Sequence, residues 1–252
     1  MLTIKAPLVS ESEDGRRIRL SAEVVVDGPD GKKVELWLEV GKEYGDFLCF
    51  ERSDAFVVAL FHWAMSRGHD MRCEAPVTRE LYYKINDELS PMIALTNSDT
   101  RQIRLEAPLA DEIPKLRGTK KFAGASGSCG VDALWSLKTN LHESGCCGDS
   151  LDITHLVCMQ LHVPNEDDTS DTRRQTFNAI CANAKSLCRQ IERMYNRKLE
   201  VIEVYSNFDN QCLSGLTATR FVSYGPALRH MHFKNFLVAI IFRLDIPYSN
   251  SI

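Results

Sequence analysis

The feature that most constrains the fold is a run of small residues at positions 123–133, Ala-Gly-Ala-Ser-Gly-Ser-Cys-Gly-Val-Asp-Ala. A β-type stretch, residues 120–124, precedes it, and an amphipathic helical segment, residues 131–141, follows it. A strand, a turn of small residues and a helix start together expose backbone N–H groups at the positive end of a helix. Such a turn predicts an anion site, and phosphate is the usual anion.

Composition limits the class of protein. The chain of 252 residues has room for one large domain or two small ones. Its net charge of −4 argues against nucleic-acid binding through bulk charge. Nine cysteines at scattered positions, without a signal peptide, predict a reducing, cytoplasmic setting. The apolar runs are too short to span a bilayer, so no membrane association is expected.

Residues 1–115 are predicted to form a smaller α+β accessory domain, because the expected elements follow the order β-β-β-α-β-α-β. Alternating apolar residues at 17–26 and 33–40, on either side of a Gly- and Pro-rich turn, predict a β-hairpin. Ser53 and Gly68 are expected to bound a helix. Further elements are a second helix from Thr78 to about Ile93 and a strand at residues 101–107.

Three aromatic residues of this segment are candidates for a substrate surface: Trp37, Tyr44 and Phe47. Packing in the core or at its rim is the expected role of such residues. The segment contains no recognisable catalytic constellation. Residues 108–117, with two prolines and a glycine at 118 beyond them, are interpreted as a linker.

Residues 116–252 change to strictly alternating strands and helices, which predicts a parallel α/β sheet. Strands are expected at residues 120–124, 153–161 and 199–205, and helices at residues 131–141, 172–196 and from 226 to about 240. Because ligands of such sheets bind at the carboxyl ends of the strands, the loops 126–132, 162–171 and 206–209 should converge on one cleft. Three strands are few, so the sheet is expected to look truncated and to leave an edge that favours pairing with another chain.

Two nucleotide fingerprints are excluded by spacing. Gly124, Gly127 and Gly130 form G-x-x-G-x-x-G, which is not the dinucleotide motif, and no Gly-Lys-Ser/Thr follows. The segment 128–133, Ser-Cys-Gly-Val-Asp-Ala, instead resembles the Ser-Gly-Gly-x-Asp-Ser loop of the ATP pyrophosphatase (PP-loop) superfamily. That superfamily includes asparagine synthetase, NAD synthetase and the 7-cyano-7-deazaguanine synthases. The resemblance covers about residues 118–245 and implies a HUP-type parallel sheet.

The resemblance also implies a function and a site. It implies an ATP-binding, AMP-forming ligase or amidating enzyme that uses Mg²⁺, adenylates an unknown small-molecule or peptide substrate and releases pyrophosphate. Asp132 would hold the metal and serve in catalysis. The residues implied in nucleotide binding are Ser126, Gly127, Ser128, Cys129, Gly130, Val131 and Asp132. Asn207 and Asp209, at the end of the third strand, are the candidates for substrate contact.

Two departures from the family loop leave alternatives open. Cys129 stands where the family has glycine, and Ala133 stands where it has serine. A Cβ at position 129 disfavours a positive φ, and Ala133 removes a hydroxyl donor. The alternative is therefore a catalytically degenerate nucleotide-fold protein that acts as a binding or assembly partner, as a homo-oligomer or with another chain. A third hypothesis makes Cys129 a nucleophile, since a helix N-terminus lowers the pKa of a thiol.

Remaining polar clusters have weaker interpretations. The acidic loop at residues 166–171 is more typical of a solvated loop than of a metal site. Cys146 and Cys147 fit no zinc spacing, and Cys181 and Cys188 are expected in the core. His232 and Asn235 would lie one turn apart on the last helix.

Overall fold

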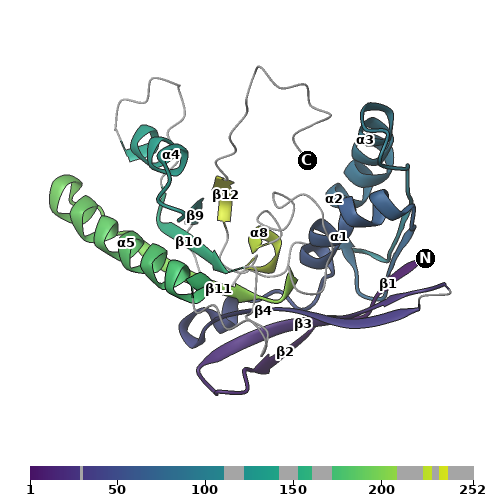
Figure 1. The fold of residues 1–252 in the computed structure, drawn as a ribbon, viewed down its shortest axis with the longest axis horizontal. Coiled ribbons are helices and arrows are strands. Elements are labelled where there is room, and N and C mark those ends of the chain that lie inside the picture. Colours follow the sequence, from purple (N-terminus) through teal and green to yellow (C-terminus); the bar gives the residue numbers. More distant parts are fainter. Residues whose placement is uncertain are drawn as a thin grey trace.

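A single mixed sheet of ten strands organises the computed structural model (Figure 1). The structure describes residues 1–28, 31–110, 122–141, 153–160, 172–208, 224–228 and 233–237. The strand order is β12-β9-β10-β11-β4-β3-β1-β5-β7, and β2 pairs with β3 beside this path. The strands are β1 (Leu2–Ile4), β2 (Leu8–Glu11), β3 (Arg17–Val26), β4 (Lys32–Gly41), β5 (Met71–Cys73), β7 (Leu105–Glu106), β9 (Phe122–Ser126), β10 (His155–Gln160), β11 (Glu200–Ser206) and β12 (Phe233–Leu237).

The predicted hairpin is confirmed as β3 and β4, which pair antiparallel from Arg17↔Gly41 to Val26↔Lys32. Side chains alternate between the two faces of these strands. One face is apolar and fully buried, and its members are Leu20, Ala22, Val24, Leu36, Leu38 and Val40. The opposite face is polar and carries Arg17, Arg19, Trp37 and Glu39, which become important for the site.

The helices of the amino-terminal part follow the predicted boundaries. The helix α1 (Asp54–Arg67) begins after Ser53 and ends at Gly68, whose φ of +66° is a left-handed cap. The side chain of Ser53 does not cap the helix but donates to the Ala75 carbonyl (3.5 Å). The other elements of this part are short. They include the 3₁₀ helix η1 (Lys42–Phe47) and a small second sheet of β6 (Val77–Thr78) and β8 (Leu109–Ala110). Three helical segments follow one another without a break: α2 (Arg79–Tyr83), the π-helical η2 (Lys84–Leu89) and α3 (Ser90–Thr96).

The strand predicted at residues 101–107 is much shorter than expected, because only Leu105–Glu106 form β7. Side chains of the preceding helices occupy the backbone groups that a longer strand would use. Ser90 Oγ accepts from the Ile103 N–H and donates to the Ile103 carbonyl, both at 2.8 Å. Asn86 bonds the N–H and the carbonyl of Leu105 in the same way, at 2.9 and 3.1 Å.

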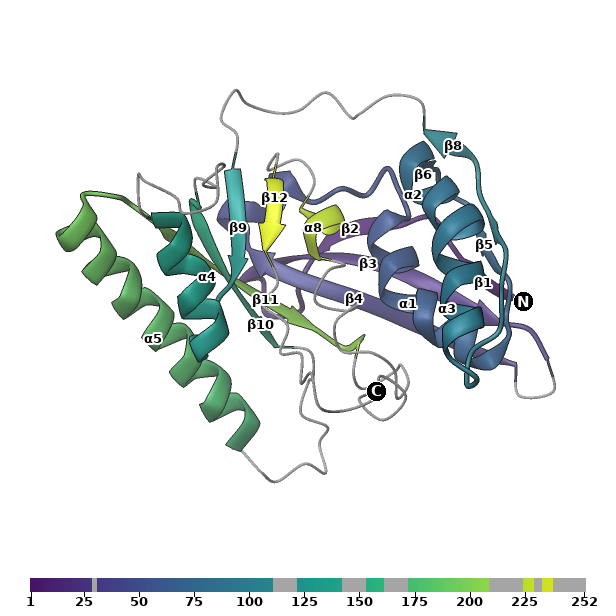
Figure 2. The same cartoon turned by 90° about the horizontal axis from the view of Figure 1, so that it is seen from above.

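The carboxy-terminal part is a doubly wound α/β unit. Its elements are β9, α4 (Val131–Leu141), β10, α5 (Thr172–Tyr195), β11, α8 (Tyr224–Ala227) and β12. The four strands are parallel, and in chain order they stand as 3-2-1-4. Figure 2 shows α4 and α5 on one side of this sheet and α8 with α1 on the other. The α/β class is therefore confirmed, and the order of the strands reverses between β9 and β12.

The last predicted helix is wrong. The helix α8 ends at Ala227, and residues 233–237 form β12, which pairs parallel with β9. The segment Phe-Lys-Asn-Phe-Leu is short and apolar, and periodicity alone does not separate a helix from a strand in such a run. Asn235 therefore lies in a strand, while His230, His232 and Ile240 fall outside the described residues.

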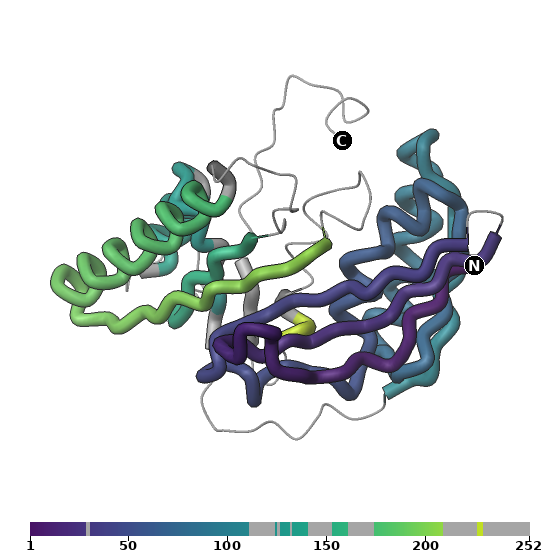
Figure 3. The backbone as a smooth tube through the Cα atoms, turned by 60° about the horizontal axis from the view of Figure 1, so that its bottom comes forward, coloured from purple at the N-terminus to yellow at the C-terminus, as the bar shows by residue number. Residues whose placement is uncertain are grey.

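The three predicted parallel strands do not leave a bare edge. The strand β12 covers β9, and β4 covers β11 by antiparallel pairing through Val204↔Val40, Tyr205↔Glu39 and Ser206↔Leu38. Figure 3 shows β11 running beside β4. One sheet thus crosses the division predicted at residues 115–116, which lies in a part of the chain outside the described ranges. We call this junction of β11 and β4 the seam.

Two hydrophobic cores lie on the two faces of the sheet. The larger core joins both parts of the chain, because Ile202, Val204 and Phe208 lie in it together with α1 and the apolar face of β3 and β4. The smaller core lies between α5 and the other face of β10 and β11, and it contains Cys158, Cys181 and Cys188. Of the helices that the structure describes, none combines the length and the apolar character needed to cross a membrane.

Candidate functional site

The small-residue loop follows β9 directly and stays in contact with β10. The Gly127 N–H donates to the Val157 carbonyl (2.8 Å), and the Cys158 thiol donates to the Gly127 carbonyl (3.4 Å). A Cβ on Gly127 would lie 2.7 Å from Cys158 Sγ and 3.2 Å from the Val157 carbonyl carbon. The glycine at this position is therefore required by the close approach of the two backbones.

Cys129 adopts a backbone conformation that glycine favours. Cys129 has a φ of +57°, in the left-handed region, which costs a residue with a Cβ about 1–2 kcal/mol. Its side chain packs against the smaller core, and its thiol donates to the Gly127 carbonyl (3.5 Å). The turn thus follows a left-handed backbone path at a residue that carries a Cβ.

The thiol hypothesis loses its physical basis in this geometry. Burial raises the pKa of Cys129, and the neighbouring Cys181 raises it further. The expectation that the helix N-terminus lowers this pKa is wrong, because the thiol faces the core. Cys181 and Cys188 are buried in the same core, as predicted.

The other loop residues face solvent at the start of α4. Ser128, Gly130 and Val131 are exposed, and Ser128 Oγ accepts a long hydrogen bond from the Gly130 N–H (3.4 Å). The Leu134 N–H donates to the Gly130 carbonyl (2.9 Å), which starts the helix. The first-turn N–H groups have no partner within a helix, and they mark its positive end. Asp132 lies in this first turn, and Ser126 is the last residue of β9.

The loop occupies the topological switch point of the sheet. It leaves β9 at its carboxyl end, and β9 lies between β10 and β12, where the strand order reverses. In doubly wound sheets, ligands bind in the crevice at this point. Ala133 is buried, so it offers neither a hydroxyl nor an exposed surface.

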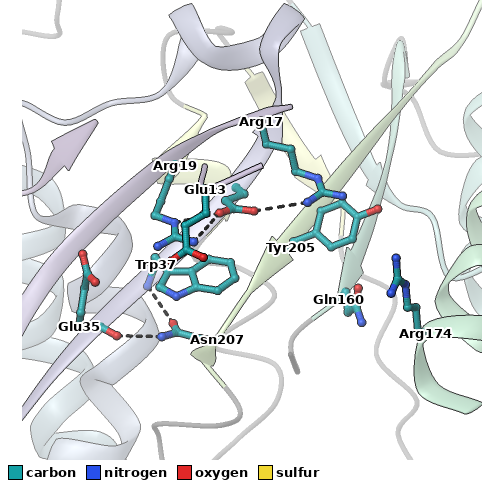
Figure 4. A pocket seen from close by; sticks show the side chains of 10 residues that line it. Glu13, Arg17, Arg19, Glu35, Trp37, Gln160, Arg174, Tyr205 and Asn207 are labelled. Carbon is teal, nitrogen blue, oxygen red and sulfur yellow. Dashed lines mark hydrogen bonds and ion pairs between the residues drawn. The ribbon is translucent and has the colours of Figure 1, made fainter. Parts of the chain in front are cut away.

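A polar pocket of about 740 Å³ lies at the seam, at the carboxyl ends of β10 and β11 (Figure 4). Among the loop residues whose side chains the structure describes, 127–131, none lines it. Its lining comes from both parts of the chain and comprises Glu13, Arg17, Arg19, Glu35, Trp37, Glu39, Gln160, Arg174, Tyr205 and Asn207. Its volume falls within the range of about 300–1,000 Å³ that is usual for small-molecule sites.

A buried carboxylate fixes two arginines in the wall of the pocket. Glu39 is 4% exposed, and its oxygens lie 2.7 Å from Arg19 and 3.6 Å from Arg17. The Arg17 guanidinium lies 3.8 Å from the centre of the Tyr205 ring, and the Arg19 guanidinium lies 4.4 Å from that of Trp37. Burial raises the pKa of Tyr205 to about 12. These contacts hold both guanidiniums in place before any ligand arrives.

Asn207, a predicted substrate residue, lines the pocket, but its side chain is hydrogen-bonded to the backbone of β4. Its side-chain oxygen accepts from the Trp37 N–H, and its side-chain nitrogen donates to the Glu35 carbonyl, both at 2.8 Å. The amide therefore extends the pairing of β11 with β4 by one step. The other substrate candidate, Asp209, lies outside the described residues.

Other candidates fall into three groups. Trp37 lines the pocket, whereas Tyr44 is buried and Phe47 packs against the larger core. The acidic loop at residues 166–171, with Cys146 and Cys147, lies outside the described ranges. Within those ranges, no cluster of three or more His, Cys, Asp or Glu side chains could hold a metal ion.

Sequence reasoning missed most of the pocket. Arg17, Arg19 and Glu39 stand at alternating polar positions of the hairpin, and this polar face was visible in the sequence. The pairing of β4 with β11 was not visible, because the two strands are far apart in the chain. Comparisons with protein-family models, curated proteins and solved structures find no match for this chain.

Proposed function

We propose that the chain is an ATP-binding protein with a HUP-type fold that adenylates an acid substrate and releases pyrophosphate. The observation that carries this proposal is the position of the small-residue loop at the switch point of a 3-2-1-4 sheet, with Cys129 in the left-handed conformation. A turn that retains this conformation at the expense of strain is consistent with selection for its exposed N–H groups.

The residues present suit a nucleotide phosphate. Exposed Ser128 and Gly130 leave the backbone open, and Gly127 has no side chain that would block the turn. Mg²⁺ in nucleotide sites is commonly held by one or two carboxylates together with the phosphates. Asp132, a residue of the first turn of α4, would supply such a carboxylate, and the ion would neutralise charge at the phosphates.

The proposed reaction is a displacement at the α-phosphate. A carboxylate oxygen of the substrate forms a bond to the α-phosphorus, and the bond from this phosphorus to the bridging oxygen of the β-phosphate breaks. Pyrophosphate departs with the electron pair, and AMP is left joined to the acid. The loop N–H groups would hold the departing phosphates, and the helix N-terminus would favour their negative charge.

Calorimetric titration with ATP and Mg²⁺ tests this proposal. We expect binding by the native chain, and a weakening of about tenfold or more in Asp132→Asn, since a charge-assisted contact contributes ~1.5–3 kcal/mol. Cys129→Gly should bind ATP at least as tightly as the native chain. Asp87→Asn, at an exposed position of η2, is the matched control and should bind normally. The absence of heat at millimolar ATP, with a folded protein, would rule out the proposal.

A second function is favoured by the exposed face of α4. Val131 is 82% exposed and Trp135 65% exposed, and Leu134 lies beside them on the same helix face. Apolar groups with this spacing are typical of a helix face that packs on another surface. This arrangement supports the alternative of a degenerate nucleotide-fold protein that acts through assembly with itself or a partner chain.

Sedimentation velocity separates the two functions. The assembly function predicts a species larger than the monomer that Trp135→Glu converts to monomer. Met194→Glu, which changes an exposed apolar residue on α5, is the matched control and should leave the assembly intact. A monomeric native chain that releases pyrophosphate from ATP would contradict the assembly function.

A further inference from the structure

The pocket at the seam lies at the same end and on the same face of the sheet as the small-residue loop. Cys158, which contacts Gly127, and Gln160, which lines the pocket, are two residues apart on β10. Alternate residues of a strand share a face and lie about 7 Å apart. A molecule in the pocket can therefore reach toward the loop along β10.

A row of side chains crosses the pocket from strand to strand. Gln160 is in register with Tyr205, Tyr205 with Glu39, and Glu39 with Arg19. The row therefore runs across β10, β11, β4 and β3, with neighbouring strands about 4.8 Å apart. Its β10 end, next to α5, is the end nearer the loop.

The charged side chains differ between the two ends of the pocket. Glu39 is occupied by Arg17 and Arg19 at the hairpin end. Glu35, which is exposed, lies two residues beyond Trp37 on β4. Arg174, exposed in the first turn of α5, and Gln160, the last residue of β10, both line the pocket (Figure 4). A guanidinium together with an amide donor suits a carboxylate, since both groups donate and the arginine binds it in a fork.

We propose that this pocket binds the acid substrate, a small carboxylate with a planar body. The carboxylate lies at Arg174 and Gln160, and the planar body lies along the Trp37 indole. The role as substrate rests on the proposed adenylation, because it places the acid beside the loop that holds the phosphates. The binding itself does not rest on it, since the lining residues that the structure describes come from outside the loop.

Three probes test the inference in the absence of ATP. They share one carbon skeleton, and their end groups are negative, neutral and positive. They are 3-phenylpropanoate, 3-phenylpropanamide and 3-phenylpropylamine, titrated calorimetrically into the full chain. We expect saturable binding of the carboxylate with a millimolar dissociation constant. The amide and the amine should bind at least about tenfold more weakly. Tighter or equal binding of the amine, or no saturable binding of the carboxylate, overturns the proposal.

Two arginine variants of α5 locate the binding. Arg174→Gln changes an exposed residue, so the fold should survive, and the preference for the carboxylate should disappear. Arg189→Gln, at another exposed position on the same helix and outside the pocket, should keep the preference. Unchanged carboxylate binding in Arg174→Gln contradicts the proposed site. Failure of ATP binding with intact carboxylate binding would remove the adenylation and leave the pocket as a carboxylate site.

Discussion

The hairpin strands and the parallel strands of this sheet are buried in different ways. The strands β3 and β4 bury one face and leave a polar face, so their residues alternate. In β10, the consecutive residues Leu156, Val157 and Cys158 are all buried, because helices cover both faces. Where the two kinds of strand meet, at the seam, the polar face of the hairpin continues beside the covered face of β11. The pocket forms where the helix-covered face of the sheet gives way to the uncovered polar face of the hairpin.

The largest expected effect concerns the core that joins the two parts. Phe208 is 1% exposed, and its ring centre lies 6.3 Å from that of Phe56 in α1. Phe208→Ala should lower the free energy of unfolding by about 3–5 kcal/mol, and both parts should unfold in one transition. Urea denaturation followed by circular dichroism and by fluorescence checks this. Met194→Ala, at a position 71% exposed, should change stability by less than about 0.5 kcal/mol. Two separate transitions would show that the seam does not couple the parts.

A methyl group in the loop should disturb the contact between the loop and β10. Gly127→Ala places a Cβ against Cys158 Sγ and the Val157 backbone, so it should destabilise the fold by about 1–3 kcal/mol. Gly130→Ala is the comparison, since the nearest atom to its Cβ would be Ser128 Oγ at 3.7 Å. Thermal melting of both variants gives the difference. Equal losses would mean that the contact between the loop and β10 is unimportant.

The side-chain bridge across the seam is the next test. Asn207→Ala removes two hydrogen bonds to β4 and leaves the Trp37 N–H and the Glu35 carbonyl without this partner. The expected loss is about 1–3 kcal/mol of unfolding free energy. Asn183→Ala, at an exposed site on α5, serves as the control and should be nearly neutral. Chemical denaturation measures both, and a neutral Asn207→Ala would favour a role in ligand contact alone.

Replacing the strained Cys129 should raise the free energy of unfolding, whereas the preceding substitutions should lower it. Cys129→Gly relieves the left-handed strain of about 1–2 kcal/mol but frees the unfolded chain, so the net gain should be about 0.5–1 kcal/mol. Asn196 also has a positive φ, of +51°, and asparagine tolerates it, so Asn196→Gly should change little. Paired melting curves test this. A loss of stability in Cys129→Gly would mean that its contacts in the smaller core outweigh the strain.

The smallest expected effect is a pH dependence of stability that comes from His155, at the amino end of β10. His155 is 4% exposed, and burial lowers its pKa despite the nearby Glu200. Because the unfolded chain then binds the proton more readily, stability is present above the ordinary histidine pKa and falls as the pH drops below it. His155→Gln should therefore lose less stability than the native chain between pH 7 and pH 5. Denaturation at the two pH values checks the difference, and identical losses would contradict the assignment.

Local patterns determined the elements and their faces. The alternation at residues 17–26 and 33–40 specified the hairpin, and Gly68 specified the end of α1. The succession of strand, small residues and helix around Cys129 predicts an anion site, and this stays a prediction. The predictions of the hairpin and of α1 succeed because burial on one face imposes a period of 2.0 or 3.6 residues on the chain itself.

Tertiary structure alone decided which edges meet. Residues 233–237 became a strand because β9 offered an open edge, although their pattern also suits a helix. The pairing of β11 with β4 placed Arg19, Trp37 and Arg174 around one pocket. Such pairing depends on contacts between residues far apart in the chain, and no local period records it. The loop could thus be predicted from the sequence, whereas the pocket beside it could not.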